Sequence, residues 1–364
     1  MTDSSIRALE RLGADVRGNM ISGSYFLRDN HVSLLIKKVL ERSGAILMDL
    51  KEARSKVEWL RRYYWRALSP GADKFTKLAS ETEENGVVLY IPRGTKIKLP
   101  IQSCFLISKP DWEQVVHNVV VVDEGAEVTL NTVCAAVTED TLHVGVTEMY
   151  VGKGAKLNYV MIHGWRESSE ARPRTGAVVE EGGVLNMYYV NLRPVSLVQS
   201  SPVVRLNVDS SVNITSILLG LGGSRLEVGS KVELSAEGAS AEIVSRSIAR
   251  DESRIRMLGE LVGMSSGARG HLECKGLQLS DRAVIEAIPI LRSESEDVEL
   301  THEAAIGRLS EEGLYYLMSK GFSEEEATSM MIRGFVDVGL ETMPPAVRPQ
   351  ISTVLNLIAK YGKG

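Results

Sequence analysis

The sequence predicts a mainly β protein whose core is a parallel β-helix, with a helical region at each end. Short apolar strands follow one another from residue 86 to about 300, and no ten-residue helical stripe interrupts them. A unit of glycine, small residue and strand also recurs at positions 125, 154, 182, 238 and 267, with spacings of 29 residues from 125 to 154, 28 from 154 to 182 and 29 from 238 to 267. A repeat of this length is typical of a solenoid, whose coils bury their apolar faces only by stacking. A β-sandwich is the alternative.

The first 85 residues predict a mainly helical N-terminal region. Over 31–43, apolar residues recur at the spacing of an amphipathic helix, which Gly44 would end: Val32, Leu35, Ile36, Val39 and Leu40. A second helix is predicted over 51–68, and the Pro70–Gly71 pair closes it. The predicted division is therefore 1–85 for this region, 86–305 for the β-helix and 306–364 for a C-terminal helical region.

The C-terminal region carries its own helix signals. Ser310 opens a helix that Gly321 ends, and Ser323 with Glu326 forms a capping box that starts the next helix. Pro344 and Pro345 break that helix, and an apolar stripe over 351–358 predicts a last one.

Composition and the cysteines exclude several classes of protein. The 364 residues hold 42 Lys and Arg against 47 Asp and Glu, with a net charge of −5, which argues against nucleic-acid binding through a basic surface. No signal peptide is visible and no apolar stretch reaches the roughly 18 residues that span a membrane, so we expect a cytoplasmic protein. The three cysteines form no CxxC pair, which favours reduced thiols over disulfides.

Three short motifs resemble catalytic signatures without their context. G-M-S-S-G at 263–267 matches a nucleophile elbow, but no helix pattern follows it, so a solenoid turn is favoured. H-E-A-A-I at 302–306 lacks the second histidine of a zinc protease. No phosphate-binding loop is present, so any ATP-driven step needs a partner.

The local pattern around Cys274 favours a core position. Strand alternation places Cys274 on the same face as Leu272, and His302 on the same face as Leu300. Glu303 would point the opposite way unless the strand ends there. Thiolate, imidazole and carboxylate within 30 residues are nevertheless ligand types that suit iron.

Three segments resemble the SufB/SufD family of iron–sulfur cluster assembly proteins. They are THEAAIGRLSEEGLYYLMSKGFSEEEATSMMIRGF at 301–335, DKFTKLASETEENGVVLYIPRGTKIKLPI at 73–101 and DEGAEVTLNTVCAA at 123–136, and the likeness covers about 70–360. The resemblance implies a right-handed parallel β-helix that dimerises through its end, with a like chain or with a SufB/SufD counterpart. It also implies C-terminal helices that dock SufC, an ABC-type ATPase.

The same resemblance implies a function. The complex would receive persulfide sulfur, iron and electrons, build a transient iron–sulfur cluster and transfer it to apoproteins. Cys274 matches the cluster-building cysteine, His302 a histidine of both branches and Glu303 a glutamate of the SufB branch. Cys134 matches the sulfur-accepting cysteine, and Trp165 an aromatic position on the inner sulfur path. The bacterial complex is associated with flavin, but nothing in this sequence marks a flavin site.

The chain departs from the SufB pattern at several places. F-L-I-S at 105–108 stands where SufB has F-R-I-N, and His163 stands at a usual glutamine. No role for Cys104 follows from the sequence. We expect a scaffold rather than an enzyme. One alternative is a SufD-like platform that stabilises a SufB partner without holding the cluster. Another is a β-helix carbohydrate-active enzyme, which needs a pair of carboxylates in a groove.

Overall fold

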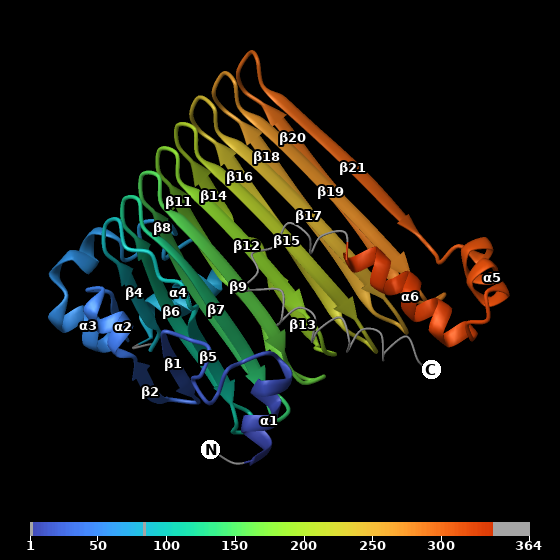
Figure 1. The fold of residues 1–364 in the computed structure, drawn as a ribbon, viewed down its shortest axis with the longest axis horizontal. Coiled ribbons are helices and arrows are strands. Elements are labelled where there is room, and N and C mark those ends of the chain that lie inside the picture. Colours follow the sequence, from blue (N-terminus) through green and yellow to red (C-terminus); the bar gives the residue numbers. More distant parts are fainter. Residues whose placement is uncertain (1–2, 83–84, 338–364) are drawn as a thin grey trace.

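The computed structural model describes residues 3–82 and 85–337, and it confirms the parallel β-helix. About eight coils stack along one axis, and each coil contributes to both of two facing sheets (Figure 1). We call these sheets A and B. The chain order of the elements in sheet A is β1 (Gly23–Arg28), β2 (His31–Ile36), β5 (Ile101–Ile107), β7 (Glu127–Ala136), β9 (Lys156–Gly164), β12 (Val184–Asn191), β15 (Ser211–Gly220), β17 (Ser240–Ala249), β19 (Arg269–Gln278) and β21 (Glu299–Gly307).

Sheet B contains the other side of each coil, and two of the coils contribute two short strands each. Its strands are β3 (Ile46–Asp49), β4 (Val87–Ile91), β6 (Glu113–Val122), β8 (Leu142–Val151), β10 (Glu170–Ala171), β11 (Arg174–Val179), β13 (Leu197–Ser200), β14 (Val203–Leu206), β16 (Arg225–Leu234), β18 (Arg254–Gly263) and β20 (Val284–Ser293). Neighbouring strands are parallel throughout, except that β2 and β3 are antiparallel to β1 and β4 at the N-terminal end.

The register of the strands explains the sequence repeat. Paired residues in successive coils are 27 to 31 positions apart; for example, Glu127 pairs with Lys156, Lys156 with Val184 and Arg269 with Glu299. Because the pairing is in register and parallel, residues at the same place in each coil point to the same side. Apolar residues therefore form continuous columns between the sheets.

The repeated glycines occupy one position of one turn. The five glycines of the repeat, at 125, 154, 182, 238 and 267, have φ between 61° and 73°, a left-handed conformation that glycine adopts without steric cost. Asp209 and Asp297 take the same conformation in two other coils, at φ 52° and 56°. Aspartate tolerates this region better than most residues, which explains the interruption in the glycine repeat.

The prediction of a helix over 31–43 is wrong for the first half of that range. Residues His31–Ile36 form the strand β2, and only Lys38–Arg42 is helical, as α2. Val32 and Leu35 pair across the hairpin with Leu27 and Ser24 of β1, so that pairing with a neighbouring strand overrides the helical spacing.

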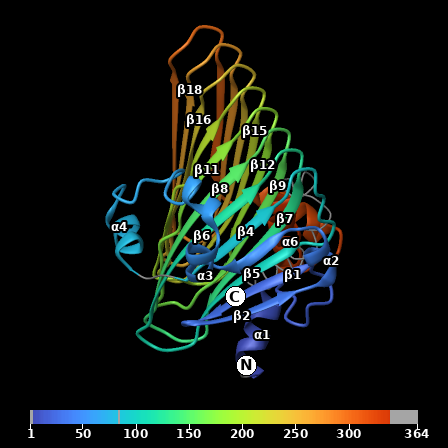
Figure 2. The same ribbon diagram turned by 90° about the vertical axis from the view of Figure 1, so that its left-hand side faces the viewer.

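The other N-terminal helices are short. They are α1 (Asp3–Arg11), α3 (Leu50–Lys56), the 3-10 helix η1 (Glu58–Arg62) and α4 (Lys74–Glu81). The helix predicted over 51–68 thus ends early, because residues 65–68 turn their backbone N–H groups toward the side chain of Glu148. Seen from the N-terminal end, α4 lies on one side of the solenoid and α6 on the other (Figure 2).

The C-terminal helices match the prediction. Helix α5 (Glu311–Ser319) has Ser310 as its N-cap, and Ser323 and Glu326 form the predicted capping box at the start of α6 (Glu324–Asp337). G-M-S-S-G at 263–267 forms the turn between β18 and β19, as expected. The predicted break at Pro344 and Pro345 and the helix over 351–358 lie outside the described residues.

Three apolar clusters hold the fold together. The largest fills the space between the sheets and contains Trp165, Cys134 and Cys274. A second joins α1 and α6 to the outer face of sheet A, and a third packs residues 48–64 on the outer face of sheet B. Within 3–82 and 85–337, no helix is long and apolar enough to cross a membrane.

Candidate functional site

Cys274 lies inside the β-helix, one coil from its C-terminal end. It shares the inner face of β19 with Leu272, as the sequence predicts, and only 1% of the residue is exposed. Burial raises the pKa of its thiol to about 11. The thiol is therefore protonated at neutral pH unless a metal or a charge brought by a partner stabilises the thiolate.

His302 lies on the same inner side, in the last coil. It pairs in register with Leu272, so the Cα atoms of Cys274 and His302 are about 8 Å apart on the diagonal between β19 and β21. His302 is exposed, because no described strand continues sheet A beyond β21. The structure thus brings the predicted thiol and imidazole to one face at an open end.

Glu303 lies on the opposite face of the same strand. It pairs in register with Glu273, and its carboxylate is 3.1 Å from the ammonium group of Lys275. Within the described residues, no three His, Cys, Asp or Glu side chains come together closely enough to hold a metal ion. Cys274, His302 and Glu303 therefore do not form a closed metal site in this single chain.

Glu303 is the outermost member of a row of alternating charges on sheet A. Arg246 of β17 is ion-paired with Glu273, whose carboxylate is 2.8 Å from Lys275. Burial alone would raise the pKa of Glu273, but the hydrogen bonds and charges of Lys275 and Arg246 hold it below its ordinary value. The row ends at the edge of the sheet, on Glu303.

Cys134, the predicted sulfur acceptor, is also in the interior but near the other end. It lies on the inner face of β7, is 2% exposed and pairs in register with Phe105 and His163. Burial, together with the neighbouring Cys104, raises the pKa of its thiol above the ordinary value. Four strands of sheet A, β9, β12, β15 and β17, lie between its strand and that of Cys274 along the stacking axis.

A group of polar side chains surrounds Cys134 inside the β-helix. Tyr189 Oη and His163 Nδ1 are 2.9 Å apart and hydrogen-bonded, and the ring of Trp165 lies 5.2 Å from that of His163 and 5.0 Å from that of His143. Burial lowers the pKa of both histidines, that of His143 to about 3. The imidazoles are therefore neutral, and His163 Nε2 and Trp165 Nε1 have no hydrogen-bond partner among the described residues.

Two members of this interior group were missed by the sequence analysis. His143 Nδ1 is 3.1 Å from Gln114 Oε1, and the two residues pair in register between β8 and β6. They are 29 positions apart, so an inward polar residue repeated at the coil period was the signal that could have found them.

Cys104 belongs to a different environment. It lies on the outer face of sheet A, in one apolar cluster with Leu9 of α1 and Leu12, which follows that helix. Burial raises the pKa of its thiol to about 12. It also lines a groove of about 420 Å³ between β5 and the β1–β2 hairpin.

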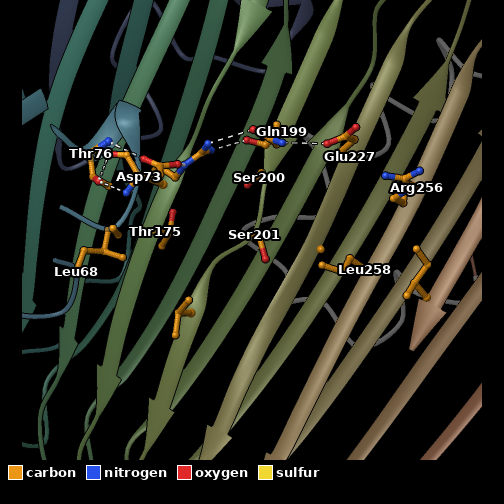
Figure 3. A pocket seen from close by; sticks show the side chains of 15 residues that line it. Leu68, Asp73, Thr76, Thr175, Gln199, Ser200, Ser201, Glu227, Arg256 and Leu258 are labelled. Carbon is orange, nitrogen blue, oxygen red and sulfur yellow. Dashed lines mark hydrogen bonds and ion pairs between the residues drawn. The ribbon is translucent and has the colours of Figure 1, made fainter. Parts of the chain in front are cut away.

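A larger groove of about 500 Å³ lies on the outer face of sheet B, beside α4 (Figure 3). Arg174 is 2.5 Å from Asp73, the N-cap of α4, and 3.2 Å from Gln199, which in turn donates to Glu227 at 3.0 Å. These polar groups are paired with one another, and none of the predicted site residues lines the groove. The network fixes α4 on sheet B.

Comparison with known proteins identifies the family. Residues 105–335 match the model described as "SUF system FeS cluster assembly, SufBD core domain", and residues 11–103 match that of the "SufBD protein N-terminal region".

Curated relatives agree with these models. An iron–sulfur cluster assembly SufBD family protein of Archaeoglobus fulgidus is 36% identical over 96% of this chain and 94% of its own length. A SufBD family protein of Methanothermobacter thermautotrophicus is 37% identical over 86% of this chain and 78% of its own length. The iron–sulfur cluster assembly protein SufB of Bacillus subtilis is 30% identical over 85% of this chain and 68% of its own length. The chain belongs to the SufBD family of iron–sulfur cluster assembly proteins.

Proposed function

We propose that the protein is a scaffold subunit that builds a nascent iron–sulfur cluster where its C-terminal coil meets a second chain. Cys274, His302 and Glu303 would be the ligands that this chain supplies, and the cluster is cargo that passes on to apoproteins. The observation that supports this most directly is the placement of Cys274 and His302 on one inner face at an open end of the β-helix.

The open end has the properties of an interface. The two terminal strands, β20 and β21, are long and unpaired on one side within the described part of the chain. Their exposed side chains include several large apolar ones, namely Ile288, Ile290, Leu291 and Ile306. Unprotected edges of this kind pair readily with another chain. An identical chain or a SufB/SufD counterpart would extend both sheets and complete the ligand set.

A mixed ligand set suits a cluster that has to leave. Fe–S clusters that stay bound are usually held by four thiolates. Here one thiolate, one imidazole and one carboxylate would come from this chain, and the last two bind iron less firmly. Release to an apoprotein then requires fewer strong bonds to break.

Sulfur would enter at Cys134. The Cys134 thiolate attacks the outer sulfur of a donor persulfide; the donor S–S bond breaks, the donor leaves as a thiolate, and Cys134 becomes the persulfide. The proton of the Cys134 thiol passes to the departing donor thiolate, because His163, which pairs with Cys134 on the next strand, has a pKa that burial lowers and therefore accepts a proton poorly. Because Cys134 is buried, the donor reaches it only when the N-terminal coils open.

The C-terminal helices offer a surface for an ABC-type ATPase. Helix α5 and the turn after it expose four large side chains, Tyr315, Tyr316, Met318 and Phe322. Apolar groups gathered in this way mark interaction surfaces. The sequence has no phosphate-binding loop, so a SufC-like partner docked there would supply ATP hydrolysis.

The direct test is the cluster content of the Cys274→Ala variant. The full chain would be expressed with its ATPase partner and purified without oxygen, and iron and acid-labile sulfide would be measured per chain. We expect near-stoichiometric iron and sulfide in the wild type and almost none in Cys274→Ala. The matched control is Cys104→Ala, which removes a buried thiol from the outer face and should keep the cluster.

Equal cluster content in wild type and Cys274→Ala would contradict the scaffold proposal. The complete absence of a cluster from both, together with a stable complex with the ATPase, would instead favour the SufD-like platform. That second candidate is favoured by the burial of Cys274 and by the position of Glu303 on the opposite face.

The proposed dimer interface predicts the effect of a charge on the last coil. Ile306→Lys places an ammonium group on the open inner face of β21, where pairing would bury it without a partner charge. Light scattering should show a dimer for the wild type and a monomer for the variant. Leu34→Lys, a matched change on the exposed strand β2 at the other end, should remain dimeric. Loss of the dimer only in Leu34→Lys would move the interface to the N-terminal end.

A further inference from the structure

The charged row on sheet A connects helix α6 to Glu303. Arg246 is almost fully buried, and its guanidinium group lies 6.0 Å from the ring centroid of Phe335 in α6. Ile332 and Val336 of the same helix belong to one apolar cluster with Ile248 of β17 and Leu277 of β19. Helix α6 lies beside the ends of these strands (Figure 1). The position of α6 and the position of Arg246 are therefore coupled by direct contact.

The contacts continue from Arg246 to the edge of the sheet without a break. Arg246 is ion-paired with Glu273, Glu273 is 2.8 Å from Lys275, and Lys275 is 3.1 Å from Glu303. The two residues of the row that lie farthest from the edge of the sheet are the least exposed. The accessible fraction of the side chain is 4% for Arg246 and 14% for Glu273, against 57% for Glu303. A shift of Arg246 is thus transmitted through the partly buried charges of Glu273 and Lys275 to an exposed carboxylate.

The ion pair with Lys275 affects whether Glu303 is available to a metal ion. An ammonium group at 3.1 Å competes with a metal ion for the carboxylate of Glu303, and it holds that carboxylate on the face opposite to Cys274 and His302. Because β21 is an edge strand, the Glu303 side chain can turn past the edge toward a second chain once this contact is released.

We propose that Lys275 is a positioning residue that retains Glu303 on the outer face of sheet A, and that α6 controls this retention through Arg246 and Glu273. Displacement of α6 by a docked partner then frees Glu303 to bind iron at the interface. The inference rests on the proposed role of Glu303 as a ligand, and it adds a link between the docking helices and that ligand.

Carbodiimide labelling of carboxylates tests the retention in the full chain without iron or a cluster. Mass spectrometry would measure the coupling of an added amine to Glu303, with Glu286 and Glu299 as internal references on the same coil. In Lys275→Gln we expect labelling of Glu303 to rise about threefold or more, since the competing cation is gone. Lys275→Arg should restore the wild-type level.

Lys231→Gln is the matched control. Lys231 of sheet B also bridges two glutamates, at 3.2 and 3.8 Å, and its side chain is 32% exposed, against 31% for Lys275. This variant changes the net charge equally and should leave the labelling of Glu303 unchanged. Unchanged labelling of Glu303 in Lys275→Gln, or an equal rise at Glu286 and Glu299, would overturn the retention of Glu303.

Phe335→Ala tests the connection to α6. Removal of the ring beside Arg246 should raise the labelling of Glu303 and leave that of Glu299 unchanged. A variant that labels like the wild type at Glu303 would overturn the role of α6.

Iron binding gives a second readout. Lys275→Gln should bind Fe²⁺ more tightly than the wild type, and this gain should vanish when Glu303→Gln is added. A gain that survives in the double variant would show that Lys275 does not act through Glu303. The labelling results stand whether or not Cys274→Ala loses its cluster, so failure of this inference and failure of the scaffold proposal can be told apart.

Discussion

Replacement of Glu148 by alanine should destabilise the protein by about 3–5 kcal/mol, the range seen when one partner of a buried charged network is removed. The carboxylate of Glu148 is fully buried, and it accepts hydrogen bonds from the backbone N–H groups of Trp65, Arg66 and Ala67 at 2.6–2.7 Å. It also lies 2.9 Å from Nε2 of His117. Alanine would remove the acceptor of these three backbone N–H groups, whose hydrogen bonds are buried at Ala67 and partly buried at Trp65 and Arg66.

The free energy of unfolding from urea denaturation would measure this loss. Glu124→Ala is the control: Glu124 forms an exposed ion pair with Arg93 at 2.7 Å, and its loss should cost less than about 1 kcal/mol. Hydrogen exchange at residues 65–68 should become much faster in Glu148→Ala alone. A loss below 1 kcal/mol, with unchanged exchange, would show that this carboxylate does not hold the segment.

Acid should destabilise the protein well before its carboxylates are neutralised. His143 is buried and neutral, and its pKa is lowered from 6.5 to about 3, so the folded state resists protonation while the unfolded chain accepts a proton near pH 6.5. Stability is therefore complete above pH 6.5 and is lost as the pH falls toward 3, by about 1.4 kcal/mol for each pH unit. His163, whose pKa is also lowered by burial, acts in the same direction.

Urea denaturation at pH 7, 6, 5 and 4 would test this. The free energy of unfolding of the wild type should fall with decreasing pH, with a slope that includes one proton taken up on unfolding by each of His143 and His163. His143→Gln should lose one of them, so that its stability changes less over this range even if it is lower at pH 7. Identical slopes in the two proteins would show that His143 does not resist protonation.

The fold could be predicted because its main signal is local and repeated. The glycines at 125, 154, 182, 238 and 267 each satisfy a turn in their own coil, and five copies at one period are sufficient to identify a solenoid. The strand β2 could not be predicted in the same way. Its apolar residues fit a helical spacing, and only pairing with β1 makes them a strand.

In the candidate site, too, local features could be predicted from the sequence and contacts between distant residues could not. Alternation along one strand places His302 and Glu303 on opposite faces, and the structure has them so. Three other contacts join residues from different coils or regions. They are the ion pair of Glu303 with Lys275, the hydrogen bond of Gln114 with His143 and the hydrogen bonds from the backbone of residues 65–68 to Glu148. None of them has a local signal.

The sequence by itself therefore determined the β-helix, the two capped C-terminal helices and the faces on which Cys274, His302 and Glu303 lie. These follow from backbone periodicity and turn chemistry, which act within a few residues. Only the tertiary structure decided the open terminal coil, the neutral histidines around Cys134 and the charged row from Arg246 to Glu303. Those features depend on the register between coils about 29 residues apart and on burial, and both arise only when the coils stack.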